Sequence, residues 1–527
     1  MFRARRPPSP WRTSRLAGAL LVAVLAAGAA HATPLDFIPV GDPLERELRL
    51  LDLVSSRRLS NQLILRRLHA RPLERFELRG PGVAPADDPL IAPSLTRIER
   101  DLGRDVPRAD SVRVPGTTPR LLQHAPDPDT RVEISMALEG GGVTDEHDSR
   151  FVSGTGVHAR LGVQVDRLLA YSHLIFGQVD SSRTFADPIV ANTDVTTFTE
   201  ESYLAYAARS GRLAVQFGRS RWHWGPGDEA SLMLSKTSAP LTGLGFRASV
   251  PADRLEFTAL NSTLAATAGE QLAVHRLEWQ ARDGLRLGIG EAARYQSSRW
   301  EPLYAIAVIP YVLVQRILAS DEPDSADQIR NNVMVSFDAA WRIAEGTRIY
   351  GELLVDDLHA KTAEIPNKLA YQVGLDGLGM VGDARASWNV EFTRLSRFVY
   401  TSYFGRSYEA QGAPLGFPTG PDSRRLRVRG ALDFGPDWQL NGAVAQTDQG
   451  ESGLGVPFVP GSPVPDVWRF AGVVTRARDL DVGARWWPAS GVDLEASVGW
   501  RWVENAGHVT GADDDGARAA FALRLVR

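Results

Sequence analysis

Between residues 131 and 527 the chain repeatedly alternates apolar and polar residues over segments of about ten residues. In one such segment, Leu494, Val498 and Trp500 fall on one side of an extended chain, and Glu495 falls on the other. A period of two is typical of a β-strand with one apolar face and one polar face. Roughly sixteen to twenty segments show it, so the sequence predicts an all-β fold.

Two all-β architectures fit this alternation. A soluble sandwich or barrel packs its apolar faces inward, whereas an outer-membrane barrel turns them toward lipid and lines its lumen with polar residues. Tight links such as 282–284 alternate with long polar connections such as 405–423 and 449–466, which is the arrangement of outer-membrane barrels. The longest apolar run after the N-terminus, 303–314, is about a dozen residues and too short for a spanning helix. We therefore predict a transmembrane barrel. Paired tryptophans at strand ends fit its interfacial girdle: Trp222 and Trp224, Trp486 and Trp487, and Trp500 and Trp502.

Residues 1–32 have the pattern of a secretory signal peptide. Five arginines precede an apolar run, 16–30, and Ala30-His31-Ala32 has the small-x-small form of a cleavage site. The alternative is a membrane anchor, but the run has about 15 residues, whereas a span needs roughly 20. Cleavage would change the formal net charge from −4 to about −9. That charge argues against nucleic acid as a partner.

Residues 33–104 change to helical spacing. Asp42 is placed to cap a first helix and Pro43 to open it, residues 59–68 form a second helix or a turn of one, and Ser94 caps a third helix. These helices form either a small independent domain or a bundle that closes one end of a larger structure. A stretch rich in Pro, Asp and Arg, 105–130, is expected to be a linker, and the barrel takes up 131–527.

The segment 212–227 brings unusual chemistry to the end of one strand. Its first half alternates as a strand, and Gly225-Pro226-Gly227 ends it, because Pro cannot donate to a ladder and Gly frees the backbone to turn. Between them, Arg219 and Arg221 alternate with Trp222 and Trp224. A strand therefore delivers two guanidiniums and two indoles to a rim or to an interior.

Several stretches together resemble the capsule assembly Wzi family of outer-membrane proteins. The resemblance covers most of the chain that follows the signal peptide, and the combination of YGELLVDD with RxxxxWGPG is its most specific part. The matching stretches are VGDPLERELRLL with SLTRIERDLGR, Gly218-Arg219 with Trp224–Gly227, Leu287–Glu291 with Tyr295, Tyr350–Asp357, and Val390–Arg394 with Tyr400 and Tyr403.

The resemblance implies a barrel of about eighteen antiparallel strands with a helical bundle at its periplasmic end. It also implies a lectin-like protein of the Gram-negative outer membrane that binds surface polysaccharide and supports capsule or exopolysaccharide attachment or assembly. The expected partners are the polysaccharide, outer-membrane lipid and the capsule-export machinery. We expect a monomer with no enzymatic activity and no cofactor.

Candidate site residues centre on the acidic segment YGELLVDD. A period of two places Glu352 and Asp356 on one face and Asp357 on the other. Burying carboxylates is costly unless they are paired, so one reading is a lumenal ion-pair network with arginines such as Arg276 and Arg394. The other is a sugar site, because carboxylates and guanidiniums bind hydroxyls and an indole covers a pyranose face. The candidates for polysaccharide contact are Arg219, Arg221, Trp222, Trp224, Glu352, Asp356, Asp357, Glu391 and Arg394.

Two other functions stay open at this point. A carboxylate-dependent hydrolase could use Asp356 and Asp357 with His359, or Glu291, Glu352 and Glu391. However, the chain has no GxSxG, HExxH or phosphate-loop motif, no Cys, and only 10 scattered His, so neither catalysis nor a metal site is expected. A porin-like channel for small or saccharide solutes could use the arginines at 425, 427 and 429.

Overall fold

The computed structural model describes residues 40–54, 88–102, 121–127, 130–145, 149–151, 155–178, 195–208, 212–250, 254–265, 268–306, 308–321, 331–357, 365–402 and 406–526. The predicted signal peptide and the predicted helix at 59–68 lie outside these residues.

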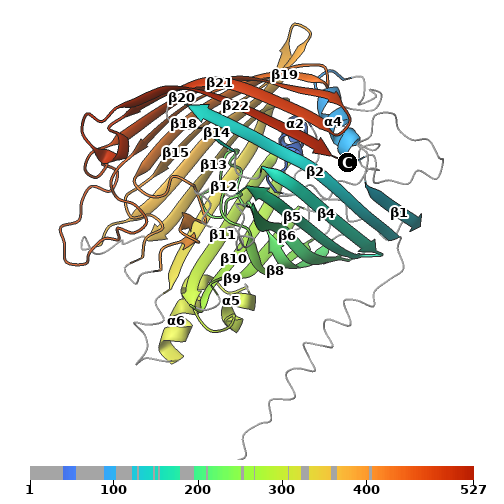
Figure 1. Ribbon diagram of the computed structural model, residues 1–527. Coiled ribbons are helices and arrows are strands. Elements are labelled where there is room, and N and C mark those ends of the chain that lie inside the picture. The colour runs from blue at the N-terminus through green and yellow to red at the C-terminus, as the bar shows by residue number, and fades with distance from the viewer. Residues whose placement is uncertain are drawn as a thin grey trace, which may run out of the picture.

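Eighteen antiparallel strands form a closed barrel (Figure 1), in agreement with the predicted fold class and strand number. Each strand pairs with the next along the chain, and β2 pairs with both β4 and β22, which closes the sheet. In order round the barrel, the strands are β2 (Thr130–Asp145), β4 (Gly156–Val165), β5 (Leu168–Gln178), β6 (Val195–Ala207), β7 (Leu213–Ser220), β8 (Leu241–Ser249), β9 (Leu255–Ala265), β10 (Glu270–Arg282), β11 (Leu285–Gln296), β12 (Asn332–Ala344), β13 (Thr347–Asp357), β14 (Lys368–Val381), β15 (Ala384–Leu395), β18 (Ser423–Phe434), β19 (Trp438–Gln449), β20 (Thr475–Ala489), β21 (Val492–Glu504) and β22 (Asp514–Val526).

Two short strands extend the edges of β2. Strand β1 (Leu122–Asp127) pairs with the first part of β2, and β3 (Ser149–Phe151) pairs with its last part. Strand β1 lies inside the stretch 105–130 that we expected to be a linker. A separate two-stranded ribbon, β16 (Glu409–Ala410) with β17 (Ala413–Pro414), lies in the connection between β15 and β18.

The outer surface of the barrel carries the apolar face of its strands. On β13, for example, Ile349 and Leu353 are exposed, whereas Tyr350, Glu352 and Leu354 between and beside them are buried. This is the arrangement of a barrel whose outer face meets lipid. Among the predicted girdle tryptophans, Trp486, Trp500 and Trp502 are exposed on that surface. The prediction is wrong for Trp222 and Trp224, which lie buried inside the barrel because their loop folds inward.

The two ends of the barrel differ. Tight turns join the strands at one end, where helices α2 (Leu44–Val54) and α4 (Ala92–Leu102) lie, and long connections join them at the other (Figure 1). The helices contact the turns: the N–H of Gly346 donates to the carbonyl of Leu53 at 3.1 Å, and Arg97 donates to the carbonyl of Pro436 at 3.0 Å. The helices therefore close the tight-turn end and do not form an independent domain. In outer-membrane barrels the tight turns are periplasmic.

The starts of the two helices follow capping rules to different degrees. The carboxylate of Asp42 accepts the N–H of Leu44 at 2.9 Å, so the first helix begins where Asp42 and Pro43 predict. The second begins at Ala92, two residues before the predicted cap Ser94. Asp88 accepts the N–H of Leu90 at 2.9 Å, while the Ser94 hydroxyl donates to the buried carboxylate of Glu47. Asp88 therefore replaces Ser94 as the cap.

Two further helices lie in the connection between β11 and β12, where the sequence pattern predicted none. They are α5 (Pro302–Ile306) and α6 (Tyr311–Asp321). Among the helices that the structure describes, none is long and apolar enough to cross a membrane.

Candidate ligand-binding site

The connection between β7 and β8, residues 221–240, folds into the lumen and is almost entirely buried; we call it the plug loop. Trp222, Trp224 and Leu232 pack there against apolar side chains that point inward from the wall, such as Leu272 and Leu354. The lumen therefore has an apolar core at this level, which a water-filled channel does not predict.

Glycines allow the sharp bend of the plug loop. Gly225 has a φ of +142°, and a Cβ on Gly227 would lie 2.0 Å from the carbonyl oxygen of Ala230. That distance leaves no room for a side chain, so a residue without a Cβ is required. The Gly-Pro-Gly sequence does end the strand as predicted, but it turns the chain inward.

Carboxylates of the barrel wall hold the plug loop by its backbone. Glu352 on β13 accepts the N–H of Leu232 at 3.0 Å and the N–H of Met233 at 3.2 Å. Glu391 on β15 accepts the N–H of Asp228 at 2.8 Å and the hydroxyl of Tyr350 at 2.7 Å. A buried carboxylate that receives such donors is compensated for part of its lost hydration. These two residues thereby position the loop.

A second segment, 396–402 with 406–422, lies against the plug loop from the side of β15 and β18. Its Tyr400 donates an N–H to Asp356 at 2.7 Å, and the hydroxyl of Tyr400 donates to the carbonyl of Leu232 in the plug loop. Close by, Lys368 pairs with Asp357 at 2.6 Å and donates to the carbonyl of Thr401 at 2.7 Å. The acidic end of β13 thus fixes the second segment, as Glu352 fixes the plug loop.

The candidate arginines also contact loops. Arg221 pairs with Glu200 and donates to the carbonyls of Lys236 and Ser238, which ties the two ends of the plug loop together. Arg394 donates to the carbonyl of Trp468 and lies 4.0 Å from the centre of the Phe470 ring. The guanidinium of Arg219 lies 5.5 Å from the ring centre of Phe198.

The structure thus places seven of the nine candidate residues in or against loops. Asp357 pairs with Lys368 of β14, and Arg219 lies at the end of the strand that leads into the plug loop. The prediction of arginine partners for the acidic segment needs correction. The carboxylate of Glu352 accepts backbone N–H groups, while Arg276 pairs with Asp338 and, at 3.2 Å, with Glu278. The period of two gave the correct faces, but it carried no information on which donors would come from a distant loop.

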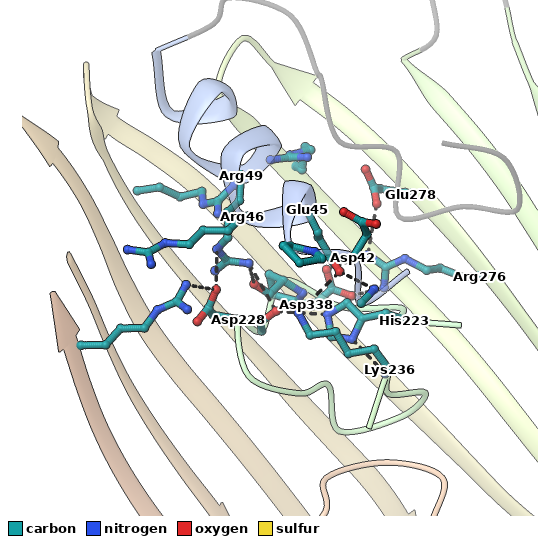
Figure 2. A pocket seen from close by; sticks show the side chains of 18 of the residues that line it. Asp42, Glu45, Arg46, Arg49, His223, Asp228, Lys236, Arg276, Glu278 and Asp338 are labelled. Carbon is teal, nitrogen blue, oxygen red and sulfur yellow. Dashed lines mark hydrogen bonds and ion pairs between the residues drawn. The ribbon is translucent and has the colours of Figure 1, made fainter. Parts of the chain in front are cut away.

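A polar cavity of about 330 Å³ lies where the tip of the plug loop meets helix α2 (Figure 2). Arg49 of the helix donates to the carbonyls of Pro226 and Gly227 at 2.9 and 3.3 Å. Asp228 at the tip pairs with Arg429 of β18 at 2.6 Å and with Arg49 at 3.4 Å. The plug loop therefore spans the lumen from the long-loop end to the helices that close the tight-turn end.

Charged side chains around this cavity shift one another's pKa values. Burial alone would raise the pKa of Asp228, but Arg429, Arg49, Lys236 and Arg427 hold it well below its usual range. Burial, assisted by Arg429, lowers the pKa of Arg46 to about 10, so this guanidinium remains a cation at neutral pH. Both basic and acidic side chains line the cavity, many of them paired with each other, and its volume is at the low end for ligand pockets.

The connection between β19 and β20, residues 450–474, differs from the plug loop and is called the surface loop. Most of its residues are exposed, including Val456, Val459 and Trp468. It is held near its ends: the carboxylate of Asp422 accepts the N–H of Ser452 at 3.3 Å and that of Ala471 at 3.0 Å. An exposed indole on a fixed loop is a surface that a sugar ring can contact.

Sequence reasoning missed three of these contributors. Asp228 and Arg49 form the contact between the plug loop and helix α2, and Trp468 lies two residues beyond the predicted connection 449–466. The alternation pattern could not identify them, because two lie in loops and the third on a helix. Within the described ranges, no group of three or more His, Asp or Glu side chains is placed to hold a metal ion.

Comparisons with known proteins agree with this fold. Residues 310–517 match the family model of the capsule assembly protein Wzi. The chain is similar to the structure of Wzi from Escherichia coli, an outer-membrane protein involved in group 1 capsule assembly and a carbohydrate-binding β-barrel, with a TM-score of 0.59, 15% identity, and coverage of 94% of this chain and 99% of that one. The resemblance to the Wzi family is therefore confirmed.

Other solved structures are similar at lower TM-scores. Acinetobacter baumannii OccAB1 has a TM-score of 0.44 with 10% identity, over 78% of this chain and 99% of that chain. Pseudomonas aeruginosa OprD has a TM-score of 0.41 with 10% identity, over 75% and 95% of the two chains. A search of curated proteins gave no significant match.

Proposed function

We propose that this barrel lies in the outer membrane of a Gram-negative cell, binds a surface polysaccharide at its long-loop end, and supports the attachment or assembly of capsule or exopolysaccharide. The observation that carries the proposal is the surface loop, which is exposed yet fixed near both ends by Asp422. The family match over residues 310–517 includes this loop. Long loops are extracellular in such barrels, so this surface would face the glycan.

Trp468 is the residue that we propose for direct contact with sugar. Trp468 is 39% exposed, and its ring lies 5.7 Å from that of Tyr371, an outward residue at the long-loop end of β14. Arg394 donates a hydrogen bond to the backbone carbonyl of Trp468 and so holds this residue in place. An indole that is held from one side and open on the other presents a flat apolar face to a pyranose.

The nine candidate residues act, in this proposal, mainly by positioning. Glu352 and Glu391 hold the plug loop, Asp356 and Asp357 hold the second inward segment, and Arg394 holds the surface loop. Trp222 and Trp224 fill the lumen beneath the loops. A rigid interior would keep the extracellular loops in the arrangement that binds the polysaccharide.

A binding role is favoured over hydrolysis by the occupation of the carboxylates. Glu291, Glu352 and Glu391, one of the two carboxylate sets considered for a hydrolase, each accept a backbone N–H, from Tyr311, Leu232 and Asp228 respectively. In the other set, Asp356 accepts the N–H of Tyr400 and Asp357 pairs with Lys368. A group that acts as acid or base must instead reach the scissile bond of the substrate. A filled lumen likewise favours binding over passage of solutes, and planar-bilayer recordings are expected to show no large steady openings.

The substitution Trp468→Ala tests the proposal. We expect purified protein to bind polysaccharide from its own cells about tenfold more weakly, since a central aromatic contact is worth over 1 kcal/mol, and cells to release more polysaccharide into the medium. Trp486→Ala is the matched control, because Trp486 is similarly exposed, at 38%, but lies on the outer wall near the tight turns.

Equal retention by the two variants would contradict the assignment of Trp468. Deletion within residues 449–466 then tests the loop as a whole, and unchanged retention would remove the surface loop from the binding surface. Heat-modifiability on a gel, in which a folded barrel migrates faster until boiled, shows that each variant is folded.

A further inference from the structure

Helices α5 and α6 pack against the outside of the barrel wall. Their buried residues Tyr304, Tyr311 and Val314 form a cluster with Ala273 of β10 and Ala293 of β11. Both alanines belong to the outward face, because their neighbours Leu272 and Ala292 belong to the apolar core inside the lumen. The helical hairpin, residues 302–306 and 308–321, is therefore on the surface where the strands would otherwise meet lipid.

The hairpin covers a polar pair on that outward face. His275 of β10 lies opposite Glu291 of β11 in the strand register, and their side chains approach to 3.1 Å. From the hairpin, Tyr311 donates its N–H to Glu291 at 2.8 Å and places its ring 4.2 Å from that of His275. Polar groups that face lipid without cover are expensive. The hairpin supplies that cover.

The height of this pair along the barrel identifies the environment of the hairpin. Glu291 comes six residues after Leu285, where β11 begins at its tight turn. Six residues after Val492, where β21 begins, the outward residue is the exposed Val498. On β21 this level therefore belongs to the apolar band, which in outer-membrane barrels is about 25 Å tall. On β10 and β11 the same level is polar, and the hairpin lies over it.

The hairpin itself exposes apolar side chains at this place. Val308 is 77% exposed, and Val312, Leu313 and Ile317 are exposed on α6. The apolar outer wall continues directly below, at the exposed residues Leu277, Ile289 and Phe337, which face one another in the strand register. Arg316 is exposed on the same face of α6, and its long side chain can reach a lipid phosphate while its stem stays among apolar groups.

We propose that the α5–α6 hairpin is embedded in the outer leaflet of the membrane, where its exposed apolar face contacts lipid acyl chains. It widens the lipid-facing surface of the barrel on one side. Lipid then contacts Val308, Val312, Leu313 and Ile317 of the hairpin in place of the polar pair formed by His275 and Glu291.

The absence of cysteine from the sequence makes a direct test possible. Three single-cysteine variants, Leu313→Cys, Val498→Cys and Val459→Cys, are labelled with a small fluorophore and reconstituted into phosphatidylcholine vesicles with brominated acyl chains. Val498 lies on the barrel wall in the apolar band, and Val459 lies on the surface loop. We expect the brominated chains to quench the fluorescence of the label at residue 313 as strongly as that of the label at 498. The fluorescence of the label at 459 should stay unchanged.

A label at 313 that behaves like the label at 459 would overturn the proposal. So would a defined protein adduct formed by a photo-crosslinker at 313 in native outer membranes, because the hairpin would then be a docking surface for a protein or a second copy of this chain. Val312→Cys serves as a second position, and heat-modifiability confirms that each labelled protein is folded.

Discussion

The plug loop and the surface loop join consecutive strands at the same end of the barrel, and both contain Gly, Pro and Trp. The plug loop folds inward until Trp224 is completely buried, whereas the surface loop leaves Trp468 39% exposed. Their composition alone does not explain the difference.

The difference lies in where the barrel provides hydrogen-bond acceptors. Glu352 and Glu391 project into the lumen and accept N–H groups from the middle of the plug loop. Asp422 lies at the rim and accepts N–H groups near the two ends of the surface loop. A loop whose centre is bound is pulled inside, and a loop bound near its ends remains presented to the outside. The position of the anchors therefore decides between a structural loop and a candidate binding loop.

Replacing a glycine in each loop should give the largest contrast. In Gly227→Ala the new Cβ would overlap the carbonyl oxygen of Ala230 at 2.0 Å, and backbone on both sides must shift. We expect the free energy of unfolding to fall by about 3 kcal/mol, at the upper end for overpacking. The control is Gly453→Ala in the surface loop, where a Cβ meets nothing within 4 Å.

Urea unfolding in detergent measures both variants, and planar-bilayer conductance reports whether the lumen has opened. If Gly227→Ala is as stable as Gly453→Ala, the plug loop is not packed as tightly as the structure has it.

Removing the side chains that accept hydrogen bonds from each loop should have an intermediate effect on stability, and it tests whether the two loops are held independently. Glu352→Ala leaves the buried N–H groups of Leu232 and Met233 without their acceptor, and we expect a loss of about 2 kcal/mol. Hydrogen exchange should then increase in the plug loop and stay unchanged in the surface loop.

Asp422→Gly is the counterpart, since residue 422 has a φ of +55°, which glycine adopts without strain. We expect it to raise exchange in the surface loop and to leave the plug loop protected. Increased exchange in both loops, in either variant, would mean that the loops are one cooperative unit and that the comparison fails.

The strand faces were predictable because a period of two is a local property. Tyr350, Glu352, Leu354 and Asp356 all face inward as the alternation predicts. The direction of the plug loop was not predictable, because tryptophans suit a lipid interface and a packed interior equally well. The acceptors for Leu232 and Met233 come from Glu352, more than a hundred residues further along the chain.

Short helices within loops show a similar limit. Helix α2 was predictable through Asp42 and Pro43, but α5 and α6 were not, since they are 5 and 11 residues long and their packing face is set by the barrel wall. One signal was present: Pro302 occupies the first position of α5, and Pro310 directly precedes α6, where proline favours a helix start. The ligand contacts of the loops depend on the glycan and remain predictions.

The smallest effect is expected from pH, at the helices that meet the tip of the plug loop. Burial alone would raise the pKa of Glu47 in α2, but Arg97, Arg385 and the Ser94 hydroxyl hold it well below its usual value of about 4.5. A carboxylate with a depressed pKa stabilises the folded state above its unfolded pKa and loses that contribution as the pH falls. Between pH 7 and pH 4 the unfolded chain begins to take up the proton while folded Glu47 stays ionised, so the free energy of unfolding should fall by up to about 1 kcal/mol through this group.

Glu47→Gln removes the titrating group and is less stable at pH 7, but it should lose less stability over the same pH range. Exchange of the α2 amides, corrected for its intrinsic pH dependence, should rise toward pH 4 in the parent protein only, and an equal rise in Glu47→Gln would show that other groups, such as Asp228, carry the acid sensitivity of this contact.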